Sequence, residues 1–215
     1  MKNPLSRIFR NCAAPQGVLG RAMLRMMNIG HRPVYAWTFD HLMLADGMRV
    51  LDIGCGGGGA ILELARRFPS ICVDGVDASE ESVAMCRRRT ADVPNHGEIV
   101  KGVADALPSA DATYDAVYAI ETIYFWPDLL AGIREMLRVL KPGGIAAVSV
   151  ECFNTDRARV WKSFVGRMEI RTPEQIVRTF REAGFTDVAH FVKGANLPTW
   201  CGMACIVGRK ANSHV

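Results

Sequence analysis

A carboxylate and a group of glycines between residues 49 and 59 are the part of this chain best suited to hold a ligand. Residues 49–53 are typical of a strand, the glycines at 54, 56, 57, 58 and 59 of a tight turn, and residues 60–68 of a helix. Because glycine has no Cβ, such a turn lets a ligand approach the bare backbone amides at a helix N-terminus. The arrangement predicts a nucleotide-type binding site.

Two cofactors are compatible with these glycines. Gly54, Gly56 and Gly59 satisfy the GxGxxG pattern of dinucleotide sites, whereas Asp52, Gly54, Gly56 and Gly58 satisfy the DxGxGxG pattern of S-adenosylmethionine sites. The Asp52 carboxylate would repel a pyrophosphate, but it would attract the ammonium and sulfonium of S-adenosylmethionine. At an effective dielectric of about 20, opposite charges about 4 Å apart gain roughly 4 kcal/mol before desolvation. Asp52 therefore favours S-adenosylmethionine.

Apolar runs that alternate with helical patterns indicate the elements that position this turn. Five runs are predicted to be strands: residues 48–53, 71–76, 98–101, 114–120 and 145–150. Such alternation with helices is typical of a parallel sheet covered by helices. The last two strand candidates, residues 187–192 and 203–208, have a link too short for a crossover helix between them. We therefore expect a hairpin whose final strand is antiparallel.

The helix signals lie between and before these strands. Ser79 is a predicted N-cap, Thr172 begins a capping box that Gln175 completes, and Gly184 is placed to end that helix. Helical spacing over residues 18–29 and 33–45 predicts a helical lead-in or lid, residues 1–46. Residues 47–211 would form the binding core, and both parts would belong to one globular domain.

Length and composition bound the class of protein. With 215 residues, 49% of them hydrophobic and 22% charged, the chain can form one sizeable core. No uninterrupted apolar run approaches the roughly 20 residues of a membrane helix. Arginines near the N-terminus interrupt every candidate signal-peptide core. A cytoplasmic enzyme is the expectation.

The seven cysteines are odd in number and scattered, which is not typical of a disulfide framework. Cys201 and Cys205 form a CxxxC pair, but along one strand their Cα atoms would lie about 13 Å apart. One metal ion could not bridge that distance, so we expect no metal site.

Positive charge gathers at the start of the chain, although the net charge is only +4. Residues 1–39 contain no acidic residue and these basic ones: Lys2, Arg7, Arg10, Arg21, Arg25 and Arg32. Such a segment could contact an acidic substrate, an anionic membrane surface or nucleic acid, and a solvated helix face explains it as well.

Further motifs follow the glycine turn in a fixed order. They are Gly75-Val76-Asp77-Ala78-Ser79, Ala104-Asp105-Ala106-Leu107-Pro108, Tyr114-Asp115-Ala116-Val117 and Leu137-Arg138-Val139-Leu140-Lys141-Pro142-Gly143-Gly144. This ordered set, within residues 48–208, resembles the class I S-adenosylmethionine-dependent methyltransferases. It is most similar to the small-molecule group that includes the ubiquinone and menaquinone C-methyltransferases.

The resemblance implies an α/β fold, a Rossmann-like and mostly parallel seven-stranded sheet with helices on both faces. It also implies a cofactor site beyond the carboxyl ends of the first, second and fourth strands. The implied cofactor-binding residues are Asp52, Gly54, Cys55, Gly56, Gly58, Asp77, Ala78, Ala104, Asp105 and Ile120. Asp77 would accept from the ribose hydroxyls and Asp105 from the adenine amino group, while Cys55 would be a small filler. Residues 141–144 are expected to form a tight turn.

The methyl acceptor should meet the cofactor where the fourth strand ends. Glu121 is the carboxylate best placed there, and His31 and His41 are imidazoles that could fold over the site. Any of them could take a proton from a phenol or an acidic carbon. An aromatic pocket for a planar or apolar acceptor is expected from Tyr35, Trp37, Tyr124 and Trp126.

Three functions stay open. The first is methyl transfer from S-adenosylmethionine to a small molecule, with release of S-adenosylhomocysteine. The second is a nicotinamide-dependent oxidoreductase, against which Asp52 argues. The third is a binding protein, or a nucleic-acid-modifying methyltransferase that uses the basic N-terminus. Residues 120–126 lack the Asp/Asn-Pro-Pro-Tyr motif of base N-methyltransferases, which disfavours nucleic acid. Nothing in the sequence indicates the oligomeric state.

Overall fold

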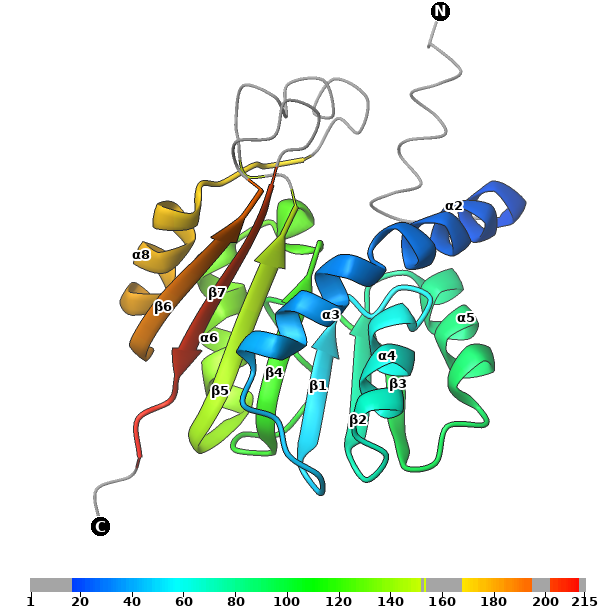
Figure 1. Cartoon of the computed structure of the whole chain (residues 1–215), viewed down its shortest axis with the longest axis horizontal. Helices are drawn as coiled ribbons and strands as arrows, with labels where there is room; N and C mark the ends of the chain where they lie inside the picture. Colours follow the sequence, from blue (N-terminus) through cyan, green and yellow to red (C-terminus); the bar gives the residue numbers. More distant parts are fainter. Residues whose placement is uncertain (1–16, 152, 154–167, 195–201, 213–215) are drawn as a thin grey trace, which may run out of the picture.

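Seven strands form one sheet in the computed structural model, which describes residues 17–151, 153, 168–194 and 202–212. The strands are β1 (Arg49–Ile53), β2 (Cys72–Asp77), β3 (His96–Lys101), β4 (Tyr114–Ile120), β5 (Leu140–Val150), β6 (Thr186–Lys193) and β7 (Met203–Arg209). Their order across the sheet is β3-β2-β1-β4-β5-β7-β6 (Figure 1). Neighbours from β3 to β5 are parallel, and β7 is antiparallel to both β5 and β6. The predicted fold class is confirmed, including the antiparallel last strand.

Helices cover both faces of this sheet (Figure 1). The elements are α2 (Gly17–Gly30), α3 (Arg32–His41), α4 (Gly59–Arg67), α5 (Glu80–Thr90), the short 3-10 helix η2 (Ile123–Phe125), α6 (Leu129–Val139) and α8 (Pro173–Ala183). Apolar residues of α3, α4 and α5 pack on one face, and those of α6 and α8 pack on the other. None of these helices is long and apolar enough to cross a membrane.

The central strands are apolar because they are covered on both sides. Every residue of β4 from Ala116 to Ile120 is buried, and so are the residues of β5 from Ile145 to Val150. Continuous apolar runs of this kind are expected of parallel strands between two helix layers. β6 lies at the sheet edge and is mostly exposed.

The predicted helix boundaries rest on local hydrogen bonds that the structure contains. The Ser79 hydroxyl accepts from the Ser82 amide at the start of α5. At α8, Thr172 and Gln175 form the reciprocal capping box, and Gly184 ends the helix in the left-handed region with φ 105°. All three predictions are confirmed.

Two boundaries differ from the prediction. The helix predicted over residues 33–45 ends at His41, because Leu42 adopts an extended conformation that leads toward the turn before β1. Residues 141–144, predicted as a tight turn, are included in β5. The pairing of β4 with β5 shifts between Tyr114 and Ala116, and Gly143 has φ 77°. The predicted turn at residues 141–144 is therefore an irregular part of β5.

The helical lead-in is joined to the sheet through α3. Val34 and Phe39 belong to the same buried cluster as sheet residues, and the Thr38 hydroxyl donates to the Ser149 hydroxyl of β5 at 2.6 Å. Residues 1–16 of the predicted lead-in and Cys201 of the predicted CxxxC pair lie outside the described residues. The division at residue 46 stays a prediction.

Candidate functional site

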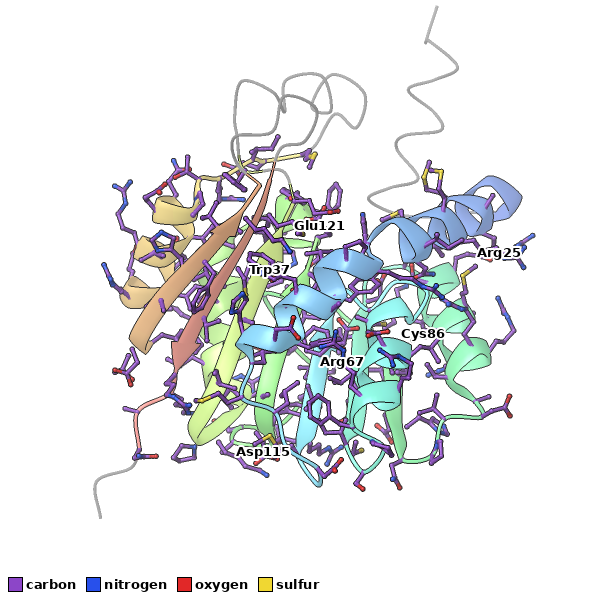
Figure 2. The ribbon with its side chains drawn as sticks, viewed as in Figure 1. Arg25, Trp37, Arg67, Cys86, Asp115 and Glu121 are labelled. Atoms are coloured by element: carbon purple, nitrogen blue, oxygen red, sulfur yellow. The ribbon has the colours of Figure 1, made fainter. Side chains whose placement is uncertain are left out.

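A cavity lies beyond the carboxyl ends of β1, β2 and β4. The chain leaves β1 toward β2 on one side and returns to β4 on the other, which is the topological switch point where open α/β sheets bind ligands. Residues of α2 and α3 also line the cavity. Figure 2 shows Glu121 at this edge of the sheet, just past the end of β4.

The glycine turn forms one wall of the cavity, and two of its positions require glycine. Gly54 has φ 79°, and a Cβ there would lie 2.3 Å from the Thr122 Cγ2 atom. Gly58 has φ 77° and precedes α4, and a Cβ there would lie 2.9 Å from the Cys86 Sγ atom. A side chain at either position would combine backbone strain with a close contact. The two glycines therefore let the turn pack closely against Thr122 and Cys86, and Gly54 lines the cavity without a side chain.

Asp52 lies on the floor of the cavity and is almost completely buried, with 2% of its surface exposed. Burial raises the pKa of its carboxyl group to about 8, which the nearby Tyr118 hydroxyl opposes and the negative Asp77 reinforces. Although the Tyr118 hydroxyl lies nearby, Asp52 Oδ2 makes no hydrogen bond of normal geometry among the described residues. A buried acceptor without a partner is costly, so this carboxyl group is suited to a cationic or hydrogen-bonding ligand.

Asp77 joins the end of β2 to the glycine turn. Its Oδ2 atom accepts from the Gly56 amide at 2.9 Å, and its Oδ1 atom accepts from the Ser79 amide at 2.8 Å. Burial nevertheless raises the pKa of the Asp77 carboxyl group. Each carboxylate oxygen has more than one lone pair, so the group can hold the turn and still accept from ribose hydroxyls.

Glu121 is held at the end of β4 by two donors. Its Oε1 atom accepts from the Tyr124 hydroxyl at 2.9 Å and from the Glu151 amide. Its backbone has φ 61°, which is uncommon for a residue other than glycine and indicates local strain of the kind found at functional sites. Burial and the nearby Glu151 raise the pKa of the Glu121 carboxyl group to about 8.

His31 and Glu151 lie beside Glu121, and we call these three side chains the polar corner. The His31 Nε2 and Glu151 Oε2 atoms are 3.8 Å apart. Burial lowers the pKa of His31 to about 4 and raises that of Glu151 to about 7. The imidazole is therefore neutral at pH 7 and can accept a hydrogen bond.

Among the described residues, these three side chains, His31, Glu121 and Glu151, could also hold a metal ion. Each offers one potential ligand atom, and the three atoms lie within 4.8 Å of one another. One oxygen of Glu121 already has two donors. We assign no metal to the group, and the expectation of no metal site stays a prediction.

Most of the predicted site residues meet in this one cavity. The predicted residues that line it are His31, Tyr35, Asp52, Gly54, Cys55, Gly56, Asp77, Ala78, Ala104, Ile120, Glu121 and Trp126. Cys55 is buried with a raised thiol pKa, which suits a filler and disfavours a nucleophilic thiolate.

Five predicted residues are not part of the cavity wall: Gly58, Trp37, His41, Asp105 and Tyr124. Gly58 forms the turn behind it, and Tyr124 holds Glu121 instead of facing an acceptor. Trp37 lies on α3 (Figure 2), where its ring meets His41 edge-on at 4.9 Å. Asp105 is exposed, because its neighbour Ala104 takes the inward position of that loop.

Sequence reasoning missed three residues that matter here: Asn28, Thr122 and Glu151. Glu151 follows β5, and the register pairs Ile120 with Ser149, so the ends of these strands bring Glu121 and Glu151 together. Joining the ends of the two neighbouring parallel strands could have found this residue. No pattern in the sequence indicated Asn28, because only the packing of α2 brings this residue to the cavity.

Comparisons with known proteins agree with this geometry. The profile of a family described as a methyltransferase domain matches residues 50–144. The uncharacterized methyltransferase YdaC of Bacillus subtilis is 28% identical over 152 residues, which cover 71% of this chain and 79% of YdaC. The ubiquinone/menaquinone biosynthesis C-methyltransferase UbiE of Geobacter sulfurreducens is 40% identical over 143 residues, 65% of this chain but 55% of UbiE.

Solved structures share the fold. A chain from the complex between the Haloferax volcanii Trm112 methyltransferase activator and a putative methyltransferase matches with a TM-score of 0.79 and 21% identity, covering 99% of this chain and 100% of that one. A phosphoethanolamine N-methyltransferase of Haemonchus contortus, in complex with S-adenosyl-L-methionine, matches with a TM-score of 0.73 and 16% identity. It covers 84% of this chain, which spans 53% of that protein.

Proposed function

We propose that the chain is a class I S-adenosylmethionine-dependent methyltransferase that methylates a small molecule with an aromatic or apolar body. The observation that carries the proposal is the meeting of the glycine turn, Asp52 and Asp77 in one cavity. Three of the relatives are named for ubiquinone/menaquinone biosynthesis, for cycloartenol and for a fatty acid, which is consistent with an apolar substrate.

The residues of the cavity fit S-adenosylmethionine. Gly54 and Gly56 line the cavity without side chains, and the Oδ2 atom of Asp52 suits the ammonium end of this ligand. Asp77 can accept from the ribose hydroxyls, and hydrogen bonds to a charged group are worth roughly 1.5 to 3 kcal/mol. When bound, the sulfonium would supply an activated methyl group for an in-line displacement.

The chain's own part in the reaction is to orient the acceptor and to take up its proton. Glu121 is held in place by the Tyr124 hydroxyl, and its pKa of about 8 suits a group that exchanges a proton near neutral pH. Neutral His31 can accept a hydrogen bond from the acceptor. Tyr35, Phe125 and Trp126 add aromatic surface that can exclude water and attract a cationic sulfur.

The alternative functions find no support. The family profile and the curated relatives are named as methyltransferases, and none of these relatives is named as an oxidoreductase. The acceptors in the relatives' names, a fatty acid and 27-O-demethylrifamycin SV among them, are small molecules rather than nucleic acids. A cytoplasmic location stays a prediction from the sequence.

A thermal-shift comparison tests the cofactor. S-adenosylhomocysteine should raise the melting temperature, because a ligand that binds only the folded state stabilises it, and NAD at the same concentration should not. Stabilisation by NAD alone would refute the proposal. A metabolite screen for release of S-adenosylhomocysteine would then identify the acceptor.

Asp77→Ala provides the matched variant for this experiment. It should weaken S-adenosylhomocysteine binding by about 1 to 3 kcal/mol in calorimetry, because two ribose hydroxyls lose their acceptor. Asp92→Ala, which removes the same group from an exposed turn, is the control and should bind like the wild type. Unchanged affinity of Asp77→Ala would remove Asp77 from the cofactor site.

A further inference from the structure

A second cavity, of about 270 Å³, lies between the N-terminal helices and α5. Five arginines line it: Arg21, Arg25, Arg32, Arg88 and Arg89. The first three come from the acid-free start of the chain, and the last two come from the end of α5. We call these five side chains and Asn28 the arginine groove. Figure 2 shows Arg25 on α2, at the end of the molecule where α5 also lies.

The positive charge of the arginine groove is only partly offset. Arg21 pairs with Glu81 at 2.9 Å, and Arg89 donates to the Gly57 carbonyl oxygen. Arg25, Arg32 and Arg88 have no ion pair with any acidic side chain in the part of the chain that the structure describes. Like charges gathered at one place repel one another and cost stability unless an anion neutralises them.

Asn28 lies between the arginine groove and the cofactor cavity and has an unused hydrogen-bond donor. Only 7% of its surface is exposed, and its Nδ2 donor has no hydrogen-bond partner among the described residues. The residue lines the arginine groove and also the cofactor cavity. A buried donor without a partner is costly, and an acceptor oxygen of an anion would satisfy it.

We propose that the arginine groove binds a phosphate group. The planar guanidinium matches two phosphate oxygens at once, and several such groups around a concave site favour a multiply charged anion over a single carboxylate. The shared chemistry is a phosphate ester, from either a free phosphorylated compound or the headgroup of an anionic lipid. Met26 and Ile29 are apolar residues of α2 and are 61% and 67% exposed. Because exposed apolar side chains can contact a lipid bilayer, the lipid source must be tested directly.

The first experiment measures binding of inorganic pyrophosphate to the full chain. Sodium chloride matches the ionic strength, so that general screening is the same in every sample. The wild type should show a rise in melting temperature and a saturable calorimetric signal. Absence of both, together with absence of binding to anionic vesicles, would overturn the proposal.

The Arg25→Gln, Arg88→Gln double variant locates the site, because neither side chain has an ion pair whose loss would unfold the protein. Pyrophosphate binding should weaken by about tenfold or more, since two charged hydrogen-bonding groups are lost. The control is Arg134→Gln, Arg178→Gln, which removes the same charge from exposed positions on α6 and α8. An equal loss in the control would show unspecific attraction and would overturn the proposal.

Two further arms separate the sources. Sedimentation with vesicles containing phosphatidic acid, against vesicles of phosphatidylcholine alone, tests the lipid headgroup. Vesicle binding that the double variant loses would assign the phosphate to a lipid, and pyrophosphate binding without vesicle binding would assign it to a free compound. Binding of single-stranded RNA without either would overturn the proposal. S-adenosylhomocysteine binding by the double variant is measured in parallel, so a failure here stays separate from the proposed methyl transfer.

Discussion

At the scale of single residues, the burial of Asp52 affects both ligand binding and the stability of the folded protein. The same burial that makes its carboxylate a selective partner for a cation also penalises its charge. Tyr118 of β4, Asp77 of β2 and Tyr35 of α3 are the titratable groups around it. The sequence indicated the charge of Asp52, but only the packing of β1 between its neighbours determined the raised pKa.

We expect Asp52→Asn to flatten the pH dependence of stability. With a pKa raised from 3.8 to about 8, Asp52 binds its proton more tightly in the folded than in the unfolded state. Its contribution is fully present below about pH 4 and is lost as the pH rises through 8, by about 6 kcal/mol at most.

Urea unfolding of the ligand-free protein at several values between pH 5 and pH 8.5 provides the measurement. Glu121 and Glu151 also have raised pKa values, so wild type and variant are compared at each pH. Parallel curves for the two proteins would contradict the assignment of a raised pKa to Asp52.

At the scale of elements, the turn between β1 and α4 is the part whose local sequence predicted its structure best. Its glycines were expected to give a tight turn, and the structure explains why two of them cannot be replaced. The turn is closed from the far side by Thr122, whose hydroxyl donates to the Ile53 carbonyl oxygen at 3.3 Å. This contact joins segments 69 residues apart, so local pattern could not reveal it.

Gly54→Ala and Gly47→Ala separate backbone strain from this contact. Both glycines have positive φ, 79° and 84°, but a Cβ at Gly47 would meet nothing within 4 Å. Gly47→Ala should therefore cost about 1 to 2 kcal/mol from conformation alone. Gly54→Ala should cost more and should also abolish the S-adenosylhomocysteine thermal shift. Equal losses of stability with cofactor binding retained would refute the role given to the turn.

At the scale of the whole molecule, α3 connects the helical lead-in to the sheet. In addition to the contacts of α3 with the buried cluster, Asp40 of α3 forms an ion pair with Arg67 of α4 at 2.8 Å. The side chain of Arg67 is labelled in Figure 2, where α3 crosses in front of the sheet. Because four residues of α3 are buried, we expect this helix to behave as part of the core rather than as a cover that opens freely.

We expect α3 and the sheet to unfold together. Backbone amides of residues 34–39 should exchange with deuterium at a free energy close to that of β4 amides, because opening α3 exposes the shared core. Native-state hydrogen exchange over a denaturant series measures both. If α3 amides exchanged at a much lower free energy than β4, residues 17–46 would instead be a separable unit.

The sequence by itself determined the order of strands and helices, the glycine turn and the helix caps, because these depend on residues close together in the chain. It also indicated the cofactor class, since Asp52 and the glycines lie within one short segment. Tertiary structure decided which candidates share the cavity: it brought Glu151 to Glu121 and left Asp105 and Trp37 out of the wall. It also brought Arg25 to Arg88 across two helices. These contacts depend on the register of neighbouring strands and on helix packing, which no local pattern encodes.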